Sequence, residues 1–252
     1  MASRRSTVAG GESEARFLSR YDASRFPRPS LAVDVALVAA KDGALRTVVV
    51  RRTEHPERGR WALPGGFVGI AEGLDAAAAR ILAAKTGLSG VVLEQLYTFG
   101  DPARDPRTRV VSVAYYALVD AGRLDAAVRE GVARARIVVP WEGETGGPVE
   151  LAGDDGADLL LAFDHPDILG MAVKRLRGKL DYTPIGFQLL PPAFTLLELQ
   201  RVHETVLGRP VNKDSFRRRM LASGQLEATG ESQKDVEHRP AELYRFARRS
   251  AV

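Results

Sequence analysis

The sequence contains no cysteine, which excludes disulfide bonds and thiolate metal sites. It also contains no apolar run near the roughly 18 residues that a membrane-spanning helix requires. The residues after the first basic side chains are polar and lack the apolar segment of an export signal. We therefore expect a cytoplasmic protein with no membrane partner.

Neither sign of charge dominates the chain. The 252 residues include 36 Lys and Arg against 32 Asp and Glu, for a formal net charge of +4, and the apolar fraction of 45% is typical of a soluble globular protein. This balance permits a nucleic-acid partner without requiring one. Two segments are locally basic, residues 174–179 and 212–219. At this length the chain can form one large domain or two ordinary ones.

Local patterns divide the chain into four segments. Residues 1–29 are polar and irregular, and we predict a mostly disordered arm. Residues 30–163 combine several strand patterns with one alanine-rich helix pattern, which predicts a mixed α/β domain. Residues 164–194 contain a further helix pattern and a proline-rich linker, so they are expected to connect two domains. Residues 195–252 then form the second domain.

The second domain begins with a capping box, in which the Thr195 hydroxyl and the Glu198 carboxylate satisfy free backbone amides reciprocally. Helical spacing continues from there to Gly208. A tight turn then leads to Asn212 as the N-cap of a second helix, residues 213–222. Two strand patterns follow, QLEATG and RPAELYRF. Two helices joined by a tight turn and followed by a β-ribbon are typical of a winged helix-turn-helix domain.

A glycine-rich segment of the first domain resembles the signature of the Nudix family of nucleoside-diphosphate hydrolases. The segment GGFVGIAEGLDAAAARILAAKTGLSG follows Trp-Ala-Leu-Pro and contains a helix pattern over residues 71–86. The signature positions that match are Gly66, Glu72, Arg80, Leu82, Gly87 and Leu88. The resemblance implies an α/β fold of the Nudix type, a sandwich with a mixed sheet between helices, over about the first 150 residues.

Three acidic positions of that signature hold other residues. Ile81, Ala84 and Lys85 stand there, and the spacing i, i+3 and i+4 puts them on one face of a helix. Carboxylates at these positions bind the magnesium ion that neutralises pyrophosphate oxygens during hydrolysis. Asp75 points elsewhere on the helix and cannot replace them. We therefore expect no catalytic residues, no metal and no hydrolysis.

Two interpretations of the altered segment stay open. In the first, Glu72 and Arg80 are structural and tie the loop to the helix. In the second, the pocket still binds a nucleoside diphosphate, and Lys85 replaces the charge of the metal. Arg51 and Arg52 end a strand just before the loop and could bind phosphate, although strand alternation predicts that only one of them faces inward.

Two further pocket candidates follow from their position in the chain. Phe99 either stacks on a base or packs in the core, and Arg107 could hold a phosphate or ribose. The predicted effector-binding residues are Arg51, Arg52, Gly66, Phe67, Glu72, Lys85, Phe99 and Arg107.

The second helix of the C-terminal domain is basic. Phe216 and Met220 are four residues apart and are expected to face the core with Leu221. This arrangement leaves Lys213 and Arg217 on an outward strip. The second helix after a tight turn is where helix-turn-helix proteins place the residues that read the major groove.

The alternative for this helix is a solvated charged face with an i,i+4 pair between Asp214 and Arg218. The position of the helix favours DNA. The predicted DNA-binding residues are Thr195, Asn212, Lys213, Ser215, Arg217, Arg218, Arg219, Lys234 and Arg239.

The complete arrangement resembles the NrtR family of Nudix-related transcriptional regulators of NAD metabolism. The linker YTPIGFQLLPPAF and the terminal segment RPAELYRF match that family, so the resemblance covers nearly the whole chain after the arm. It implies a homodimeric repressor of genes for NAD biosynthesis or salvage that binds a palindromic operator in double-stranded DNA. It also implies that ADP-ribose or a related nucleotide is the effector ligand and that no cofactor is required.

Three alternative functions stay open at this point. Some relatives of this architecture respond to sugars. The first domain could instead hydrolyse ADP-ribose-like nucleoside diphosphates with acids outside the signature, such as Glu94 or Asp101. The last helices could bind a protein partner rather than DNA.

Overall fold

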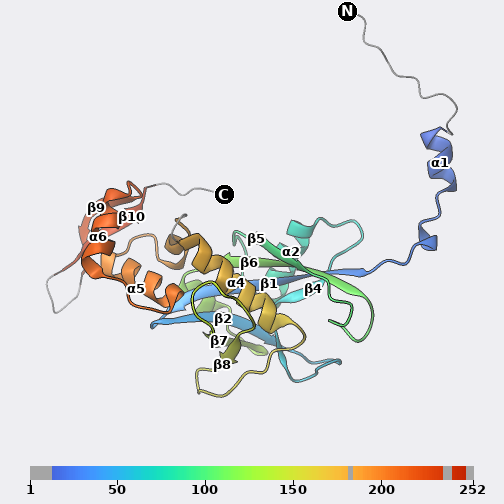
Figure 1. Ribbon diagram of the computed structural model, residues 1–252, viewed down its shortest axis with the longest axis horizontal. Helices are drawn as coiled ribbons and strands as arrows, with labels where there is room; N and C mark the ends of the chain where they lie inside the picture. Colours follow the sequence, from blue (N-terminus) through green and yellow to red (C-terminus); the bar gives the residue numbers. More distant parts are fainter. Residues whose placement is uncertain (1–12, 181–183, 235–239, 248–252) are drawn as a thin grey trace, which may run out of the picture.

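A computed structural model describes residues 13–180, 184–234 and 240–247 of the chain. The polypeptide forms a sheet-centred domain and a smaller C-terminal domain that lies at one end of the sheet (Figure 1). No helix in these ranges is long and apolar enough to cross a lipid bilayer.

The first domain is built on a mixed sheet. The strands are β1 (Ser30–Lys41), β2 (Ala44–Arg51), β3 (Trp61–Ala62), β4 (Gly65–Phe67), β5 (Glu94–Phe99), β6 (Val110–Leu118), β7 (Val132–Val138) and β8 (Glu150–Ala152). Their order is β5-β6-β1-β2-β7-β8, with β3 added to β2 and β4 added to β1. Strand β1 pairs in parallel with β6 and antiparallel with β2 and β4. Because β1 lies in the middle of the sheet, its apolar residues are buried on both faces.

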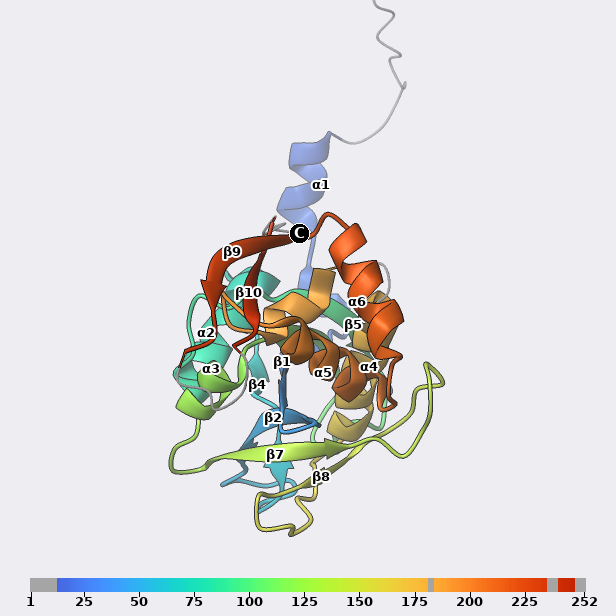
Figure 2. The ribbon, with the colours of Figure 1, turned by 90° about the vertical axis from the view of Figure 1, so that its left-hand side faces the viewer.

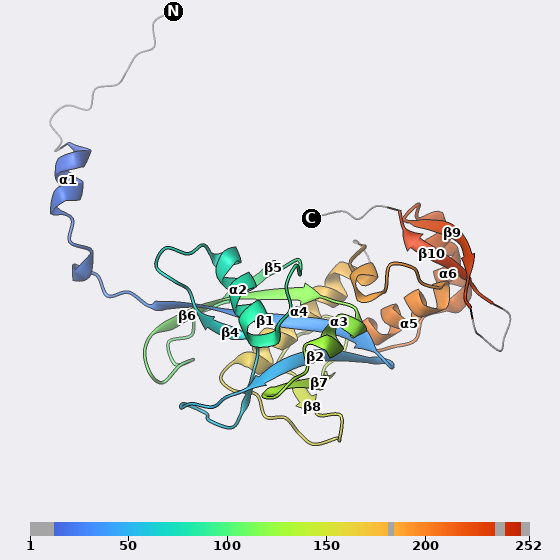
Figure 3. The ribbon, with the colours of Figure 1, turned by 180° about the vertical axis from the view of Figure 1, so that it is seen from behind.

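Helices cover both faces of this sheet. Helix α2 (Leu74–Thr86) and the short helix α3 (Ala121–Ala126) lie on the face seen in Figure 3. Helix α4 (His165–Leu180) lies on the opposite face, in front of the sheet in Figure 1. The apolar side of α4 joins the core through Ile168, Leu169, Ala172, Val173, Leu176 and Leu180. This sandwich confirms the predicted Nudix-type fold class.

The C-terminal domain has its own small core. Its elements are η2 (Pro184–Leu189), α5 (Leu196–Leu207), α6 (Lys213–Ala222), β9 (Leu226–Ser232) and β10 (Glu242–Phe246). The core consists of Phe194, Leu199, Phe216, Met220 and Tyr244. Figure 2 looks onto this domain, with α5 between α6 and the β9–β10 hairpin. The predicted winged helix-turn-helix fold is therefore confirmed.

Local signals account for the ends of several helices. Thr195 and Glu198 form the predicted capping box at the start of α5, and Asn212 accepts a hydrogen bond from the Ser215 N–H at the start of α6. Gly87 and Gly208 end α2 and α5 with φ of 77° and 68°, a left-handed conformation that glycine adopts without steric cost.

Two features differ from the sequence-based expectation. Part of the predicted disordered arm is helical: α1 (Glu14–Arg20) is capped by Ser13, and η1 (Ala23–Arg25) is capped by Asp22. These caps satisfy backbone amides locally, so a short helix forms without any buried residue.

Helix α4 was predicted to be a connecting segment. It is instead one layer of the first domain, because its apolar side faces the sheet.

Candidate functional site

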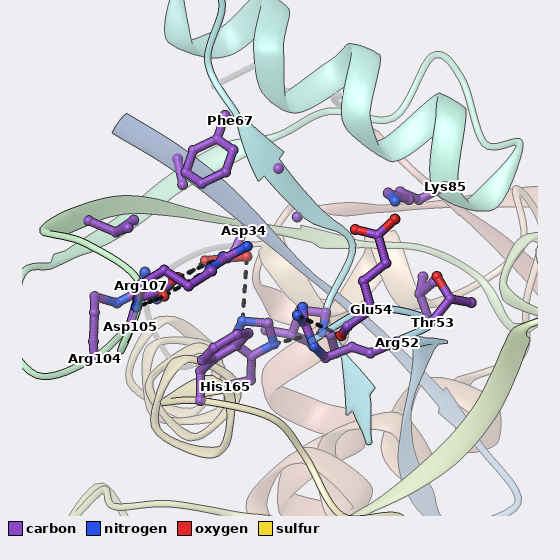
Figure 4. Close-up of a pocket in the computed structure, with 18 of the residues that line it drawn as sticks. Asp34, Arg52, Thr53, Glu54, Phe67, Lys85, Arg104, Asp105, Arg107 and His165 are labelled. Atoms are coloured by element: carbon purple, nitrogen blue, oxygen red, sulfur yellow. Dashed lines mark hydrogen bonds and ion pairs between the residues drawn. The ribbon is translucent and has the colours of Figure 1, made fainter. Parts of the chain in front are cut away.

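A cavity of about 330 Å³ opens beside the loops that follow β2 and β4 (Figure 4). Lining residues include the end of β2 and its following loop, Arg51 to Glu54, and the segment Gly65 to Phe67. Lys85 enters from α2, Arg107 from the loop before β6, and His165 from the start of α4. The cavity therefore combines residues from widely separated parts of the sequence.

The charged side chains of the lining have a positive excess. Five are cationic and three are acidic: Arg51, Arg52, Lys85, Arg104 and Arg107 against Asp34, Glu54 and Asp105. Arg107 donates two hydrogen bonds to Asp105, from Nε at 3.0 Å and from Nη2 at 2.7 Å. This hydrogen bonding lowers the pKa of Asp105, so its carboxylate stays ionised. An anionic ligand fits this balance of charge.

Two aromatic rings lie beside arginines of the lining. The Arg107 guanidinium carbon lies 5.9 Å from the centre of the half-exposed Phe67 ring. The Arg52 guanidinium carbon lies 4.6 Å from the centre of the Phe163 ring. Such pairs hold a flat cation against an aromatic face and offer a planar surface to a ligand ring.

A buried ionic cluster forms the floor of the cavity. Arg104 donates two hydrogen bonds to Asp164, from Nε at 2.8 Å and from Nη2 at 2.6 Å, and its Nη2 also lies 3.5 Å from Asp34 Oδ2. Ser112 donates its hydroxyl to Asp34 at 2.5 Å, and His165 Nε2 lies 3.5 Å from Asp34 Oδ1. Arg104 offsets part of the charge of the two carboxylates, and Asp34 also accepts the Ser112 hydroxyl, so these acids can be buried at this position.

His165 is held as a neutral ring in this cluster. Its Nδ1 accepts a hydrogen bond from the Leu63 N–H at 2.9 Å, which assigns the ring proton of the neutral form to Nε2. Burial lowers the pKa of His165, although the nearby Asp34 and Asp164 carboxylates oppose this shift. The ring therefore links the end of β3 to the start of α4 without adding a charge.

None of these floor residues was among the predicted site residues. Asp34 carried one signal, because it is the only acidic residue in the otherwise apolar strand LAVDVALVAA. A side chain at position 65 would overlap the Asp34 carboxylate, which explains why this position is a glycine. The contacts with Arg104, Asp164 and His165 had no local signal, since they depend on the packing of α4 against the sheet.

The three altered signature positions have different environments. Ile81 is buried under Gly66, where a Cβ would lie 3.2 Å from the Ile81 Cδ1 atom. Ala84 and Lys85 are exposed, and Lys85 lines the cavity. Within the described ranges Lys85 forms no hydrogen bond or ion pair, so its ammonium group is available to a ligand. Among the described residues, no group of three or more His, Asp or Glu side chains could hold a metal ion.

Glu72 and Arg80 tie the loop to α2. Arg80 donates from Nε and Nη2 to the two carboxylate oxygens of Glu72, at 2.6 and 2.7 Å, and Glu72 also accepts the Gly69 N–H at 3.0 Å. The hydrogen bonds from Arg80 and Gly69 lower the pKa of Glu72 to about 2. Arg80 also donates to the Phe67 carbonyl oxygen at 3.2 Å. This geometry favours the structural interpretation of the pair.

The structure gathers six of the eight predicted effector-binding residues at the cavity: Arg51, Arg52, Gly66, Phe67, Lys85 and Arg107. Glu72 and Phe99 do not line it. Phe99 packs against the core cluster beneath α4 and against the edge of Tyr97, with ring centres 5.4 Å apart. The expectation that only one of Arg51 and Arg52 faces inward was wrong, because both residues line the cavity.

The two acids proposed for an alternative hydrolase lie outside the cavity. Glu94 accepts a hydrogen bond from Lys179 of α4. Asp101 is exposed and accepts the Ala103 N–H at 2.7 Å. Neither carboxylate is in position to act on a ligand held by the cavity residues.

Helix α6 presents a basic face to the solvent. Phe216 and Met220 are buried, as expected, whereas Lys213 and Arg217 are exposed. Leu221 was expected in the core but is 45% exposed, because the small domain packs only one side of the helix.

Most of the other residues predicted to bind DNA are exposed to solvent. Asn212, Ser215, Arg218, Arg219 and Lys234 are exposed, and Arg239 lies outside the described residues. In the part of the chain that the structure describes, Asp214 and Arg218 do not form the expected ion pair.

The prediction that Thr195 contacts DNA does not agree with its position in the structure. Its side chain is buried, with 3% of the residue exposed, and its hydroxyl donates to Glu198 Oε2 at 2.9 Å and accepts the Glu198 N–H at 3.1 Å. Because both hydrogen-bonding functions of the hydroxyl are used within the capping box, Thr195 starts helix α5 and is not exposed for contact with DNA.

Comparison with known proteins supports both domains. Residues 28–148 match the family model for the NUDIX domain, and residues 186–246 match the model for the NrtR DNA-binding winged helix domain. The chain is 38% identical to the ADPR responsive transcriptional repressor NtrR of Acinetobacter baylyi, over 93% of this chain and 89% of that protein.

Two solved structures of Shewanella oneidensis NrtR are also similar. The complex with a 27mer DNA is 35% identical, with a TM-score of 0.70, and the match covers 86% of this chain and 93% of that chain. The NUDIX domain in complex with ADP ribose is 32% identical, with a TM-score of 0.51, and the match covers 66% of this chain and 99% of that chain.

Proposed function

The chain belongs to the NrtR family of Nudix-related transcriptional regulators, and from this premise we propose that it is a transcriptional repressor whose DNA binding responds to ADP-ribose. One observation is the main support for the proposal. A cavity with a positive excess of charge, next to the glycine-rich loop that resembles the Nudix signature, belongs to the same chain as a winged helix domain with a basic outer helix. The regulated genes are those of NAD biosynthesis or salvage.

The chemistry of the cavity supports a nucleoside diphosphate as the effector. Arg51 can donate two parallel hydrogen bonds to a phosphate, and Lys85 adds a point charge. Arg52 and Arg107 use Nε and Nη2 for contacts within the protein and can donate to a phosphate from Nη1. Together they offset the negative charge that a pyrophosphate brings. The exposed face of Phe67 suits the stacking of an aromatic base. The cavity volume of about 330 Å³ lies within the range of small-ligand pockets.

We propose that the domain binds its ligand without hydrolysing it. Hydrolysis of a pyrophosphate by this type of site requires carboxylates that hold magnesium next to the bridging oxygens. The helix face that would carry them presents Ile81, Ala84 and Lys85. A lysine at that position repels a divalent cation but attracts the ligand phosphates, so a metal-dependent catalytic site becomes a binding site.

The winged helix domain supplies the DNA contacts. We propose that the N-terminal turns of α6, with Lys213 and Arg217, enter the major groove, and that Arg218, Arg219 and Lys234 contact the flanking phosphates. A two-fold homodimer would place two such helices roughly 34–36 Å apart on one face of the duplex, and the matching operator would be palindromic. If ADP-ribose binds better to a conformation that does not fit DNA, it weakens operator binding by the same factor.

A mobility-shift titration on the DNA upstream of the protein's own gene tests this function. We expect a specific complex whose apparent Kd rises on addition of ADP-ribose and not of free ribose. Incubation with ADP-ribose and magnesium is expected to give no AMP above a protein-free control. Steady AMP release that a chelator abolishes would favour the hydrolase, and failure to bind any duplex would favour the protein-interaction alternative.

A further inference from the structure

Helix α4 connects the effector cavity to the DNA-binding domain. Its first residue, His165, lines the cavity, and its last two turns contact helix α5 (Figure 1). His165 and Arg177 are twelve positions apart, which corresponds to about 18 Å along the helix axis at 1.5 Å per residue. The two ends of one continuous helix thus lie at the two functional parts of the molecule.

The first end of α4 is held by residues of the cavity. The Asp164 carbonyl oxygen accepts the N–H groups of Asp167 and Ile168 at 3.0 and 3.1 Å, so Asp164 begins the helix. Its carboxylate binds Arg104 through two hydrogen bonds, and Arg104 lines the cavity. A ligand phosphate near Arg104 competes with Asp164 for the same guanidinium group. A phosphate bound at Arg104 would therefore disturb the contact that positions the first turn.

The residue before this turn adds a second link to the cavity. Phe163 has φ of 54°, which is unfavourable for a bulky side chain. Its N–H donates to Glu57 Oε2 at 2.6 Å, and its ring lies against Arg52. This conformation persists only while its neighbours hold it. A ligand that engages Arg52 removes one of these supports.

The other end of α4 holds the winged helix domain. Arg177 is buried and donates from Nε to the Val206 carbonyl oxygen of α5 at 2.9 Å. Its Nη1 donates to the carbonyl oxygens of Trp141 and Gly143 in the first domain, at 3.3 and 2.8 Å. The guanidinium carbon also lies 4.8 Å from the Trp141 ring centre. One side chain thus joins α4, a loop of the first domain and the end of α5.

Arg177 has no carboxylate partner in the described ranges, and burial lowers its pKa. Backbone carbonyls and the Trp141 ring hold its charge, so small displacements of α5 are not opposed by an ion pair. A second cavity, of about 610 Å³, lies at this joint between the β1–β2 turn, the loop at Trp141 and the end of α5. This space permits the small helix shifts of about 1–2 Å that are typical of coupled interfaces.

We propose that helix α4 transmits occupancy of the effector cavity to the DNA-binding domain, with the Arg104–Asp164 pair as its receiving contact and Arg177 as its delivering contact. This inference rests on the proposed function and deepens it. Ligand phosphate draws Arg104 away from Asp164, α4 shifts against the sheet, and Arg177 moves the end of α5. The position of α6 relative to the rest of the protein then changes, because α5 and α6 share one core.

The substitution Arg177→Lys tests the delivering contact. Lysine keeps the charge but cannot bridge three carbonyl oxygens from one planar group. Arg175→Lys is the matched control, because Arg175 lies on the same helix and donates to a carbonyl oxygen, that of Leu96, within the first domain only. The measured quantity is the ratio of operator Kd with and without saturating ADP-ribose, together with the Kd for ADP-ribose itself from calorimetry.

For the wild type and Arg175→Lys we expect this ratio to lie between about 5 and 150. For Arg177→Lys we expect it to fall below twofold, while the Kd for ADP-ribose stays within about twofold of the wild-type value. An unchanged ratio in Arg177→Lys overturns the inference, and so does a loss of ADP-ribose binding in that variant. A wild-type ratio of one, or no operator binding at all, contradicts the proposed function instead.

A readout without DNA covers the case in which Arg177→Lys no longer binds the operator. The chain has two tryptophans, so Trp61→Phe leaves Trp141, which lies against Arg177, as the only indole emitter. We expect ADP-ribose to change the Trp141 emission in this background, and Arg177→Lys to abolish the change although calorimetry still detects binding. A Trp141 signal that is constant on binding, or that persists without Arg177, overturns the inference.

Discussion

Replacement of Lys85 is the most direct perturbation of the effector cavity. Its ammonium group lines the cavity, is exposed and has no partner in the described part of the chain. At about 6 Å from a phosphate charge, with an effective dielectric constant of about 60, one unit charge contributes about 1 kcal/mol. Lys85→Ala is therefore expected to weaken ADP-ribose binding about fivefold. Charge reversal in Lys85→Glu doubles the change in binding free energy, which corresponds to about 25-fold weaker binding.

Calorimetric titration with ADP-ribose at low and high ionic strength is the assay for this prediction. The difference between the wild type and Lys85→Ala should shrink as salt shortens the Debye length from about 10 Å at 0.1 M to about 3 Å at 1 M. Lys213→Ala is the control, because it removes the same charge from α6 and should leave the Kd for ADP-ribose unchanged. Equal affinity of Lys85→Ala and wild type at low salt would refute the assignment of Lys85 as a phosphate contact.

Arg217 lies on the exposed side of α6, and Arg217→Ala is expected to weaken operator binding. If the side chain contacts one phosphate, the slope of log K against log salt concentration should become shallower by about 0.9. An unchanged affinity and slope would rule this contact out. Phe216→Ala removes a side chain that is 97% buried in a small core and should destabilise the C-terminal domain by about 3–5 kcal/mol, seen as lost operator binding with retained ADP-ribose binding. The folded protein keeps His165 neutral because burial lowers its pKa below 6.5, whereas the unfolded chain takes up a proton there. The free energy of unfolding should therefore fall as the pH drops below about 6.5, and His165→Asn should show a smaller decrease of Tm over that range than wild type.

Features that depend on neighbouring residues could be predicted from the amino-acid sequence. The capping box at Thr195 and Glu198, the glycine that ends α2, and the limits of α6 all follow from hydrogen bonds within one or two turns. The altered positions at Ile81, Ala84 and Lys85 were evident for the same reason, since helical periodicity fixes which residues share a face. Buried Phe216 and Met220 also followed from periodicity.

Periodicity was less informative near the ends of elements. It placed Leu221 in the core, although the domain is too small to cover that side of α6. It assigned opposite directions to Arg51 and Arg52, although β2 ends between them. The capping function of Thr195 was evident, but its burial was not, because burial depends on how the chain on either side packs.

The floor of the cavity and its connection to the second domain depend on contacts between distant parts of the chain. Ser112 and Asp34 are 78 positions apart, and Arg104 and Asp164 are 60 positions apart, yet both pairs are hydrogen-bonded. Their contact depends on the parallel register of β1 with β6 and on α4 lying across the sheet. The amphipathic pattern of α4 and its basic end could be read from its sequence. Long-range packing determines which face of the sheet α4 covers and which carbonyl oxygens Arg177 contacts. The free energy of burying one surface depends on every other element that packs against it.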